Sequence, residues 1–165
     1  MSTSSNLLWA ALALGVVTGM RSMLAPALVG RALARRDDLD DAPGPAPTLA
    51  STGAQRFFVP IAAAELLGDK MPFAPDRTIA PSMLVRALSG GVTAAALAAV
   101  QREPVWLPAL IGASAALVAS EVGIGLRKRY GSSGGLANAA LGLTEDCLAL
   151  AVANAGLRKA LDPRP

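Results

Sequence analysis

Apolar residues fill long stretches of this chain, and polar residues gather mainly at the ends of those stretches. Residues 7–30 form the first stretch, which only Arg21 interrupts, and residues 79–100 and 105–126 form two others. Each has at least the ~20 residues that a helix needs to cross the ~30 Å hydrocarbon core of a bilayer. The pattern predicts three full membrane-spanning helices, with a break or kink in the second at residues 89–91, where serine and two glycines follow one another.

Two other apolar stretches are shorter or are interrupted. Residues 57–67 are about half the length of a membrane-spanning helix and run directly into charged residues and prolines. Residues 136–157 contain Glu145 and Asp146 near their middle. We expect two short, broken or re-entrant helical segments here. They must be buried against protein, because non-helical backbone at membrane depth is tolerated only beside protein or a water-filled cavity.

Three clusters of basic residues leave two topologies open. The clusters lie at 31–36, 127–129 and 158–159. If all five apolar stretches cross the membrane, the second cluster lies on the opposite side from the first, against the tendency of basic residues to remain cytoplasmic. If the two short segments enter and return, all three clusters lie on one side. We prefer the second alternative.

The composition agrees with a lipid environment. Hydrophobic residues make up 53% of the 165 residues and charged residues 16%, whereas soluble domains average about 45–50% and 25%. We therefore expect an all-α helical bundle in the lipid bilayer, forming a single membrane domain over residues 1–165. Within it, the acidic and proline-rich residues 37–52 predict an exposed linker.

Several kinds of chemistry lack their usual residues. The chain has no histidine, so zinc sites and general bases lose their most common side chain. Cys147 is the sole cysteine, which excludes a disulfide within the chain. The basic residues flank apolar stretches and do not form patches with aromatic residues, so nucleic acid is not expected as a partner. We expect no metal and no cofactor.

Ionisable residues within or beside the apolar stretches are the main candidates for function. They are Arg21, Glu65, Asp69, Lys70, Arg86, Glu121, Glu145 and Asp146. Each costs about 2.5–3.5 kcal/mol near the bilayer centre, so such residues normally face a cavity or pair with one another. They form either a polar pathway or a set of salt bridges that fixes the packing. Glu65 and Asp69, one helical turn apart, are the preferred functional pair. Arg21, Arg86 and Glu121 are interpreted as pairing charges, with Glu121 also close enough to reach the interface.

Small residues at four-residue spacing predict close contacts between helices. Gly15 and Gly19 form one such pair, and Gly112 and Ala116 form another. Helices associate in lipid largely through van der Waals contact, which such small faces permit. The contacts form either within the chain or between copies, and a homo-oligomer is expected.

A glycine-rich segment precedes the last apolar stretch. It contains Gly131, Gly134 and Gly135 and leads into Asn138. Backbone amides at the start of a helix can bind an anion, but the lysine of a phosphate-binding loop is missing. A plain flexible turn is the preferred interpretation, and anion binding is the alternative.

Three segments of the chain resemble one family. They are GMRSMLAPALVG at 19–30, AELLGDKMP at 64–72 and GLRKRYGSSGGLANAALGLTEDCLALAVA at 125–153. They are similar to the domain of unknown function 4126 family, whose members are small bacterial membrane proteins. That family has an E-x-x-x-D-K-x-P motif and a later glycine-rich segment followed by an E-D pair. The resemblance covers most of the chain outside the acidic linker. It implies a multi-pass protein of the inner (cytoplasmic) membrane and implies no activity.

The resemblance also selects particular positions. They are Glu65, Asp69, Lys70, Pro72, Gly134, Gly135, Asn138, Glu145 and Asp146. The chain departs from the pattern at two places. Ala139 replaces the usual proline, and Arg21 stands where an uncharged polar residue is more frequent. The chemistry of a pocket therefore does not transfer in detail.

The preferred function is that of a small transporter or channel-like protein. In transporters, interrupted helices with buried acids meet near the midplane and form a site for an ion or small solute. The residues expected to line it are Glu65, Asp69, Lys70, Asn138, Glu145 and Asp146. The alternative is a structural or accessory membrane subunit, in which the buried charges are packing salt bridges. An intramembrane enzyme ranks third.

Overall fold

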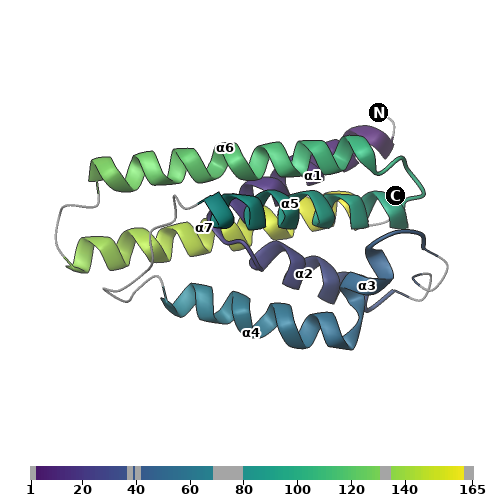
Figure 1. Cartoon of the computed structure of the whole chain (residues 1–165), viewed down its shortest axis with the longest axis horizontal. Helices are drawn as coiled ribbons and strands as arrows, with labels where there is room; N and C mark the ends of the chain where they lie inside the picture. Colours follow the sequence, from purple (N-terminus) through teal and green to yellow (C-terminus); the bar gives the residue numbers. More distant parts are fainter. Residues whose placement is uncertain (1–2, 37–38, 40–41, 69–79, 131–134, 162–165) are drawn as a thin grey trace.

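The computed structural model describes residues 3–36, 39, 42–68, 80–130 and 135–161, which form seven helices and no strand. The helices are α1 (Thr3–Met20), α2 (Leu24–Leu33), α3 (Ala46–Ala50), α4 (Thr52–Gly68), α5 (Ala80–Val100), α6 (Trp106–Tyr130) and α7 (Gly135–Leu161). The predicted all-α class is confirmed for this part of the chain. The long helices follow the long axis of an elongated bundle (Figure 1).

The first predicted span is not one continuous helix. α1 ends at Met20 and α2 begins at Leu24, and the start of α1 lies at the same end of the molecule as the end of α2 (Figure 1). At that end, the Lys159 Nζ of α7 lies 5.9 Å from the centre of the Trp9 ring of α1. α1 therefore enters the bundle and α2 returns. We call residues 19–23, where the two helices meet, the apex.

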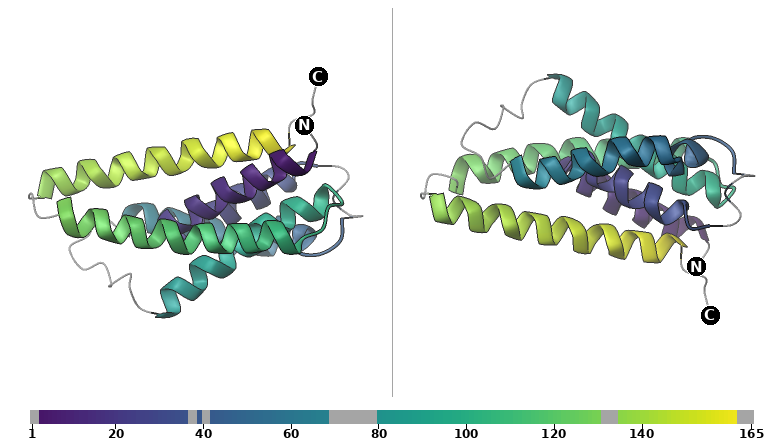
Figure 2. Two further views of the ribbon diagram at one scale, coloured as in Figure 1. Left: turned by 90° about the horizontal axis from the view of Figure 1, so that it is seen from above. Right: turned by 90° about the horizontal axis from the view of Figure 1, so that it is seen from below.

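The other long helices alternate in direction. α4 leads away from the end that holds α3, α5 returns to it, α6 leads away again, and α7 returns (Figures 1 and 2). At the shared end, the side-chain amide of Gln101, just after α5, donates to the Ala160 carbonyl of α7 at 3.1 Å. The start of α1 and the end of α7 consequently lie at the same end of the bundle.

The preferred arrangement of the basic clusters is not found. The cluster at 31–36 begins in the last turn of α2 and continues past its end, and the cluster at 127–129 lies in the last turn of α6, at the opposite end of the bundle (Figure 1). The physical reason is that the chain returns at the apex and not within residues 136–157. Those residues belong to α7, which is one continuous helix of 27 residues. The helix α5 is likewise continuous through residues 89–91.

Two further segments differ from their predicted form. Residues 57–67 lie within α4, a helix of 17 residues that contains Pro60, while residues 69–79 lie outside the described residues. The predicted linker contains α3, whose Leu49 is only 3% exposed. This short helix packs against α2 and α5. The second half of the linker therefore belongs to the packed bundle.

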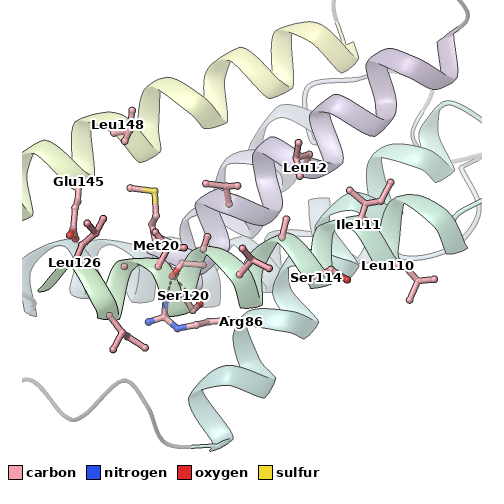
Figure 3. Close-up of a pocket in the computed structure, with 18 residues that line it drawn as sticks. Leu12, Met20, Arg86, Leu110, Ile111, Ser114, Ser120, Leu126, Glu145 and Leu148 are labelled. Atoms are coloured by element: carbon pink, nitrogen blue, oxygen red, sulfur yellow. Dashed lines mark hydrogen bonds between the residues drawn. The ribbon is translucent and has the colours of Figure 1, made fainter. Parts of the chain in front are cut away.

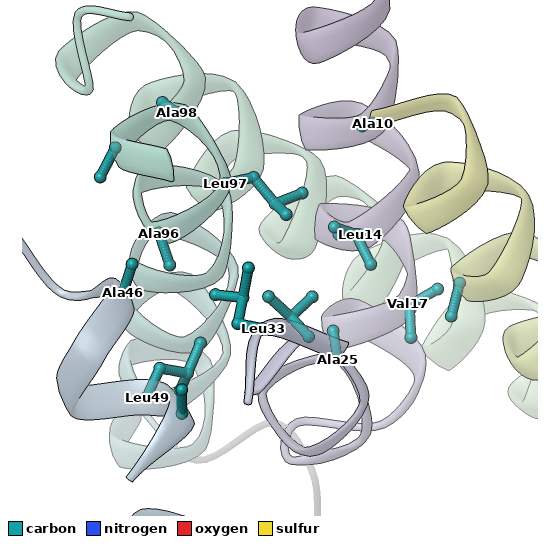
Figure 4. Packing of buried hydrophobic residues seen from close by; sticks show 14 of the residues in the cluster. Ala10, Leu14, Val17, Ala25, Leu33, Ala46, Leu49, Ala96, Leu97 and Ala98 are labelled. Carbon is teal, nitrogen blue, oxygen red and sulfur yellow. The ribbon is translucent and has the colours of Figure 1, made fainter. Parts of the chain in front are cut away.

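The buried core lies between α1, α2, α3, α5 and α7 (Figure 4). Leu14, Leu33 and Leu97 are completely buried at its centre. Alanines fill much of the remaining space, above all the run at 94–99 on α5. Because alanine side chains are small, the helix backbones approach one another closely at this core.

The predicted small-residue faces make close contacts inside the chain. A Cβ added to Gly15 would lie 2.7 Å from the Cβ of Ala115, and one added to Gly19 would lie 2.5 Å from the carbonyl oxygen of Ala116. Both contacts join α1 to α6, and Gly112 of α6 is equally close to α5. These faces are therefore occupied within one chain. The homo-oligomer stays a prediction that would need other surfaces.

Within the described residues, two helices are long and apolar enough to cross a membrane, in the segments Pro81–Val100 and Trp106–Leu126. Of these segments, 50% of the first and only 22% of the second is buried inside the protein. Such low burial is unlike the core helix of a soluble protein. The large apolar side chains that α6 exposes are Trp106, Leu107, Leu110, Leu117, Val118, Val122 and Leu126. α6 thus presents an apolar surface to its surroundings.

Candidate functional site: a polar apex inside the bundle

The break between α1 and α2 leaves backbone groups that a continuous helix would pair. The carbonyl of Gly19 would accept a hydrogen bond from the amide of Met23, four residues later. The Met23 amide donates to Oε2 of Glu65 on α4 at 2.9 Å. The Gly19 carbonyl accepts from Nη1 of Arg86 on α5. The Ser120 hydroxyl of α6 shares its hydrogen between the Ala116 carbonyl of its own helix, at 2.7 Å, and the Gly19 carbonyl, at 3.2 Å. Side chains from three other helices thereby satisfy the broken backbone.

The charges at the apex match the dipoles of the two helices. A helix carries partial negative charge at its C-terminus and partial positive charge at its N-terminus. The guanidinium of Arg86 binds at the C-terminus of α1, and the carboxylate of Glu65 binds at the N-terminus of α2. Oε1 of Glu65 also accepts a hydrogen bond from Oγ of Ser22. α2 has no cap from its own N-cap residue, so Glu65 acts as a cap supplied by another helix.

A salt bridge joins the apex to α7. Nε and Nη2 of Arg21 donate to Oδ1 of Asp146 at 2.7 and 2.5 Å. The side chains are only 3% and 10% exposed. A buried charge left without its partner is strongly destabilising. This pair therefore links the apex, where the chain reverses direction, to the middle of α7.

A groove of about 760 Å³ reaches the apex from the side (Figure 3). Gly19 and Met20 from the end of α1 line it, as do Arg86 and Ser120. Most of its other lining is apolar and comes from α6, with further residues from α1 and α7. Glu145 of α7 also lines it. A largely apolar space therefore lies beside the C-terminus of α1, where the Gly19 carbonyl is hydrogen-bonded.

Among the described residues, no three histidine, cysteine, aspartate or glutamate side chains are grouped so that they could hold a metal ion. What the apex offers is hydrogen bonding. Its backbone carbonyl and amide can exchange partners with a ligand that carries both a donor and an acceptor.

Comparison with known families gives one match. The family described as a domain of unknown function, DUF4126, matches residues 8–158. The chain belongs to the DUF4126 family. No curated protein and no solved structure matches it. The DUF4126 match includes every apex residue and the partners contributed by α4 to α7. Because its description states no activity, a function for this DUF4126 member has to be argued from the site itself.

The residues that the resemblance to DUF4126 selected lie at different places in the structure. Glu65 and Asp146 each bond different residues of the apex, whereas Glu145, the neighbour of Asp146 in sequence, lines the groove. Asp69, Lys70, Gly131 and Gly134 lie outside the described residues. Gly135 begins α7, and Asn138 lies in its first turn, with a side chain outside the described part.

The residues interpreted as pairing charges also have different surroundings. Arg21 bonds Asp146, and Arg86 bonds a backbone carbonyl. Glu121 is exposed on α6. Sequence reasoning missed Ser22 and Ser120, because single serines in apolar stretches are common. The available signal was their position: Ser22 directly follows the charged interruption of the first stretch, and Ser120 precedes Glu121.

Proposed function

We propose that this chain is an integral membrane protein with four crossing helices, α4 to α7, and one re-entrant pair, α1 and α2. The exposed apolar face of α6 supports this proposal, since so large an apolar surface would be a liability in water. The covered apex supports it too, because a membrane tolerates non-helical backbone at depth only when protein or water satisfies it. The whole chain would form one membrane domain.

The distribution of basic residues supports a multi-pass protein of the cytoplasmic membrane with the start of α1 in the cytoplasm. The end of the bundle at that side carries Arg31, Arg35, Arg36, Arg56, Arg102, Arg158 and Lys159. Among the described residues, the opposite side receives Arg127, Lys128 and Arg129 from α6. Basic residues are more frequent in cytoplasmic segments, so the richer end is the cytoplasmic one.

The function that the apex supports best is the binding and passage of a small molecule across the membrane. The observation that carries it is the broken backbone at Gly19 and Met23, paired with side chains from α4, α5 and α6. Transporters bind substrates with the ends of broken helices. A ligand that takes the place of Arg86 or Glu65 at those ends would keep the backbone satisfied. The ligand would be released when Arg86 or Glu65 forms these hydrogen bonds again.

Flux into liposomes tests this function. Purified protein is reconstituted and assayed for entry of protons, of K⁺ and of a head-labelled single-chain amphiphile. We expect flux of at least one of them above that of empty liposomes. Glu65→Gln should lower it several-fold, because the NH2 group that replaces one carboxylate oxygen cannot accept a hydrogen bond, so either the Met23 amide or the Ser22 hydroxyl loses its acceptor. Glu121→Gln, on the exposed side of α6, is the matched control and should retain flux. Absence of flux for all three solutes with the wild-type protein would contradict the function.

A structural or accessory subunit is the second candidate. The observation that favours it is the buried salt bridge between Arg21 and Asp146, which needs no ligand. In that case Glu65→Gln should lower the stability of the protein in detergent, and wild-type liposomes should show no flux.

A further inference from the structure

The groove beside the apex exists because two helices share a neighbour without meeting. α6 and α7 both pack against α1, but within the described part of the chain they make almost no contact with each other. Leu12, Val16, Gly19 and Met20 of α1 therefore form the floor between them. The volume of about 760 Å³ lies within the roughly 300–1,000 Å³ of pockets that hold small molecules.

The groove opens on the face that the proposed arrangement turns to lipid. Val118 and Val122 of α6 and Leu148 of α7 line it and are 64%, 56% and 54% exposed. On α6 the lining extends from Leu110 to Leu126, about 24 Å at 1.5 Å per residue. One leaflet of the hydrocarbon core is roughly half of ~30 Å. The groove can therefore accept the full length of one apolar chain from the bilayer.

The charges near the groove favour a ligand with a neutral head. Arg86 and Glu145, which have opposite charges, both line it. The nearby ions Arg21 and Asp146 neutralise each other in their salt bridge, and Glu65 faces Ser22 and the Met23 amide from α4. Among the described residues, no single sign of charge dominates the inner end. The Gly19 carbonyl and the Ser120 hydroxyl, both at the groove, are suited to a hydroxyl or amide head.

We propose that the ligand of the apex is a neutral single-chain amphiphile that enters sideways from the bilayer through this groove. Its apolar chain lies between α6 and α7, and its hydroxyl or amide head exchanges hydrogen bonds with the end of α1. This inference rests on the proposed function, because it names the class of molecule that the apex binds. It also specifies a route, from the lipid and not from the aqueous ends of the bundle.

Two glycines of α6 provide a matched test. Gly123 lines the groove and Gly125 does not, and a Cβ on either would meet nothing within 4 Å. The side chain of Gly123→Phe is therefore expected to occupy part of the groove, and Gly125→Phe makes the same chemical change outside it. The protein in nanodiscs is exposed to a monoacylglycerol with a diazirine in its chain, irradiated, and mapped by mass spectrometry with and without excess unlabelled monoacylglycerol.

We expect saturable labelling of the α6 and α7 residues that line the groove. Labelling should fall roughly tenfold in Gly123→Phe, a loss worth about 1.4 kcal/mol of binding, and should be unchanged in Gly125→Phe. A fatty acid or an alkylamine with the same chain should compete less well than the monoacylglycerol. Equal labelling of both variants, labelling that excess ligand does not reduce, or stronger competition by a charged head would each overturn the proposal.

The outcome can be separated from that of the flux assay. Saturable labelling of the groove with no flux of any solute would sustain the binding site and overturn the proposed transport. Flux of protons or K⁺ with no saturable labelling would sustain transport and overturn the amphiphile as its ligand.

Discussion

Gly112 lies where three helices meet, and its lack of a side chain sets the distances between them. The ideal Cβ of Gly15 on α1 would lie against its backbone, as would that of Gly90 on α5. A Cβ on Gly112 itself would lie 2.9 Å from the Cβ of Ala94. Contacts this short with backbone cannot be relieved by rotating a side chain. The close packing of α1 and α5 on α6, and with it the position of the apex, depends on this residue.

Gly112→Ala should therefore destabilise the protein, by about 1–3 kcal/mol as is typical of overpacked sites. Gly125→Ala on the same helix is the control. Its added Cβ meets nothing within 4 Å, and alanine is the better helix former by about 1 kcal/mol, so this variant should be neutral or more stable. Unfolding of both variants in detergent measures the difference. Equal stability of the two would show that the close contact at Gly112 does not exist.

At the level of elements, the pair α1 and α2 is held in place by other helices. Its turn contains no proline, and α1 and α2 supply no side-chain cap at their junction. Glu65, Arg86, Ser120 and Asp146, one from each of the four long helices that follow, bond the backbone or side chains of the apex. The hydrogen bonds that complete the apex therefore depend on contacts with those helices.

The Arg21–Asp146 salt bridge offers a test of this support. Asp146→Asn should cost about 3–5 kcal/mol, because it leaves a buried cation without its carboxylate. The double variant Arg21→Met with Asp146→Leu should be close to the wild type or more stable, since apolar replacement of a buried ion pair is often neutral or favourable. Unfolding free energies of this double variant and of its two single variants, Arg21→Met and Asp146→Leu, form the double-mutant cycle that measures the coupling. If the single and double variants lost equal stability, the pair would not be a buried one.

The dependence of the apex on contacts with distant helices explains which features could be predicted from sequence and which could not. Glycine spacing predicted the contacts of α1 with α6, because small faces allow close approach whatever the rest of the fold. The position of the break was not predictable, since residues 19–24 contain nothing that must end a helix and the partners lie 42 and more residues away. Gly90 and Gly91 are in a continuous helix because Gly90 is needed for close packing against α6. Asp146 does not interrupt the helix α7, because Arg21 pairs with its carboxylate.

At the scale of the whole molecule, the return at the apex determines the topology. An unbroken helix over residues 7–30 would place the start of the chain and α3 at opposite ends. The pair α1 and α2 places them together, at the end where α5 and α7 also finish (Figure 1). We propose that this arrangement persists in a membrane, with the apex inside it.

Cysteine accessibility tests that claim most directly. In a Cys147→Ser background, single cysteines replace Ser5 in α1, Thr48 in α3, or Ser132 in the sequence between α6 and α7. Cells are treated with a membrane-impermeant maleimide before or after permeabilisation. We predict that Ser5→Cys and Thr48→Cys react only after permeabilisation and that Ser132→Cys reacts in intact cells. Reaction of Ser5→Cys and Thr48→Cys from opposite sides of the membrane would contradict the re-entrant pair.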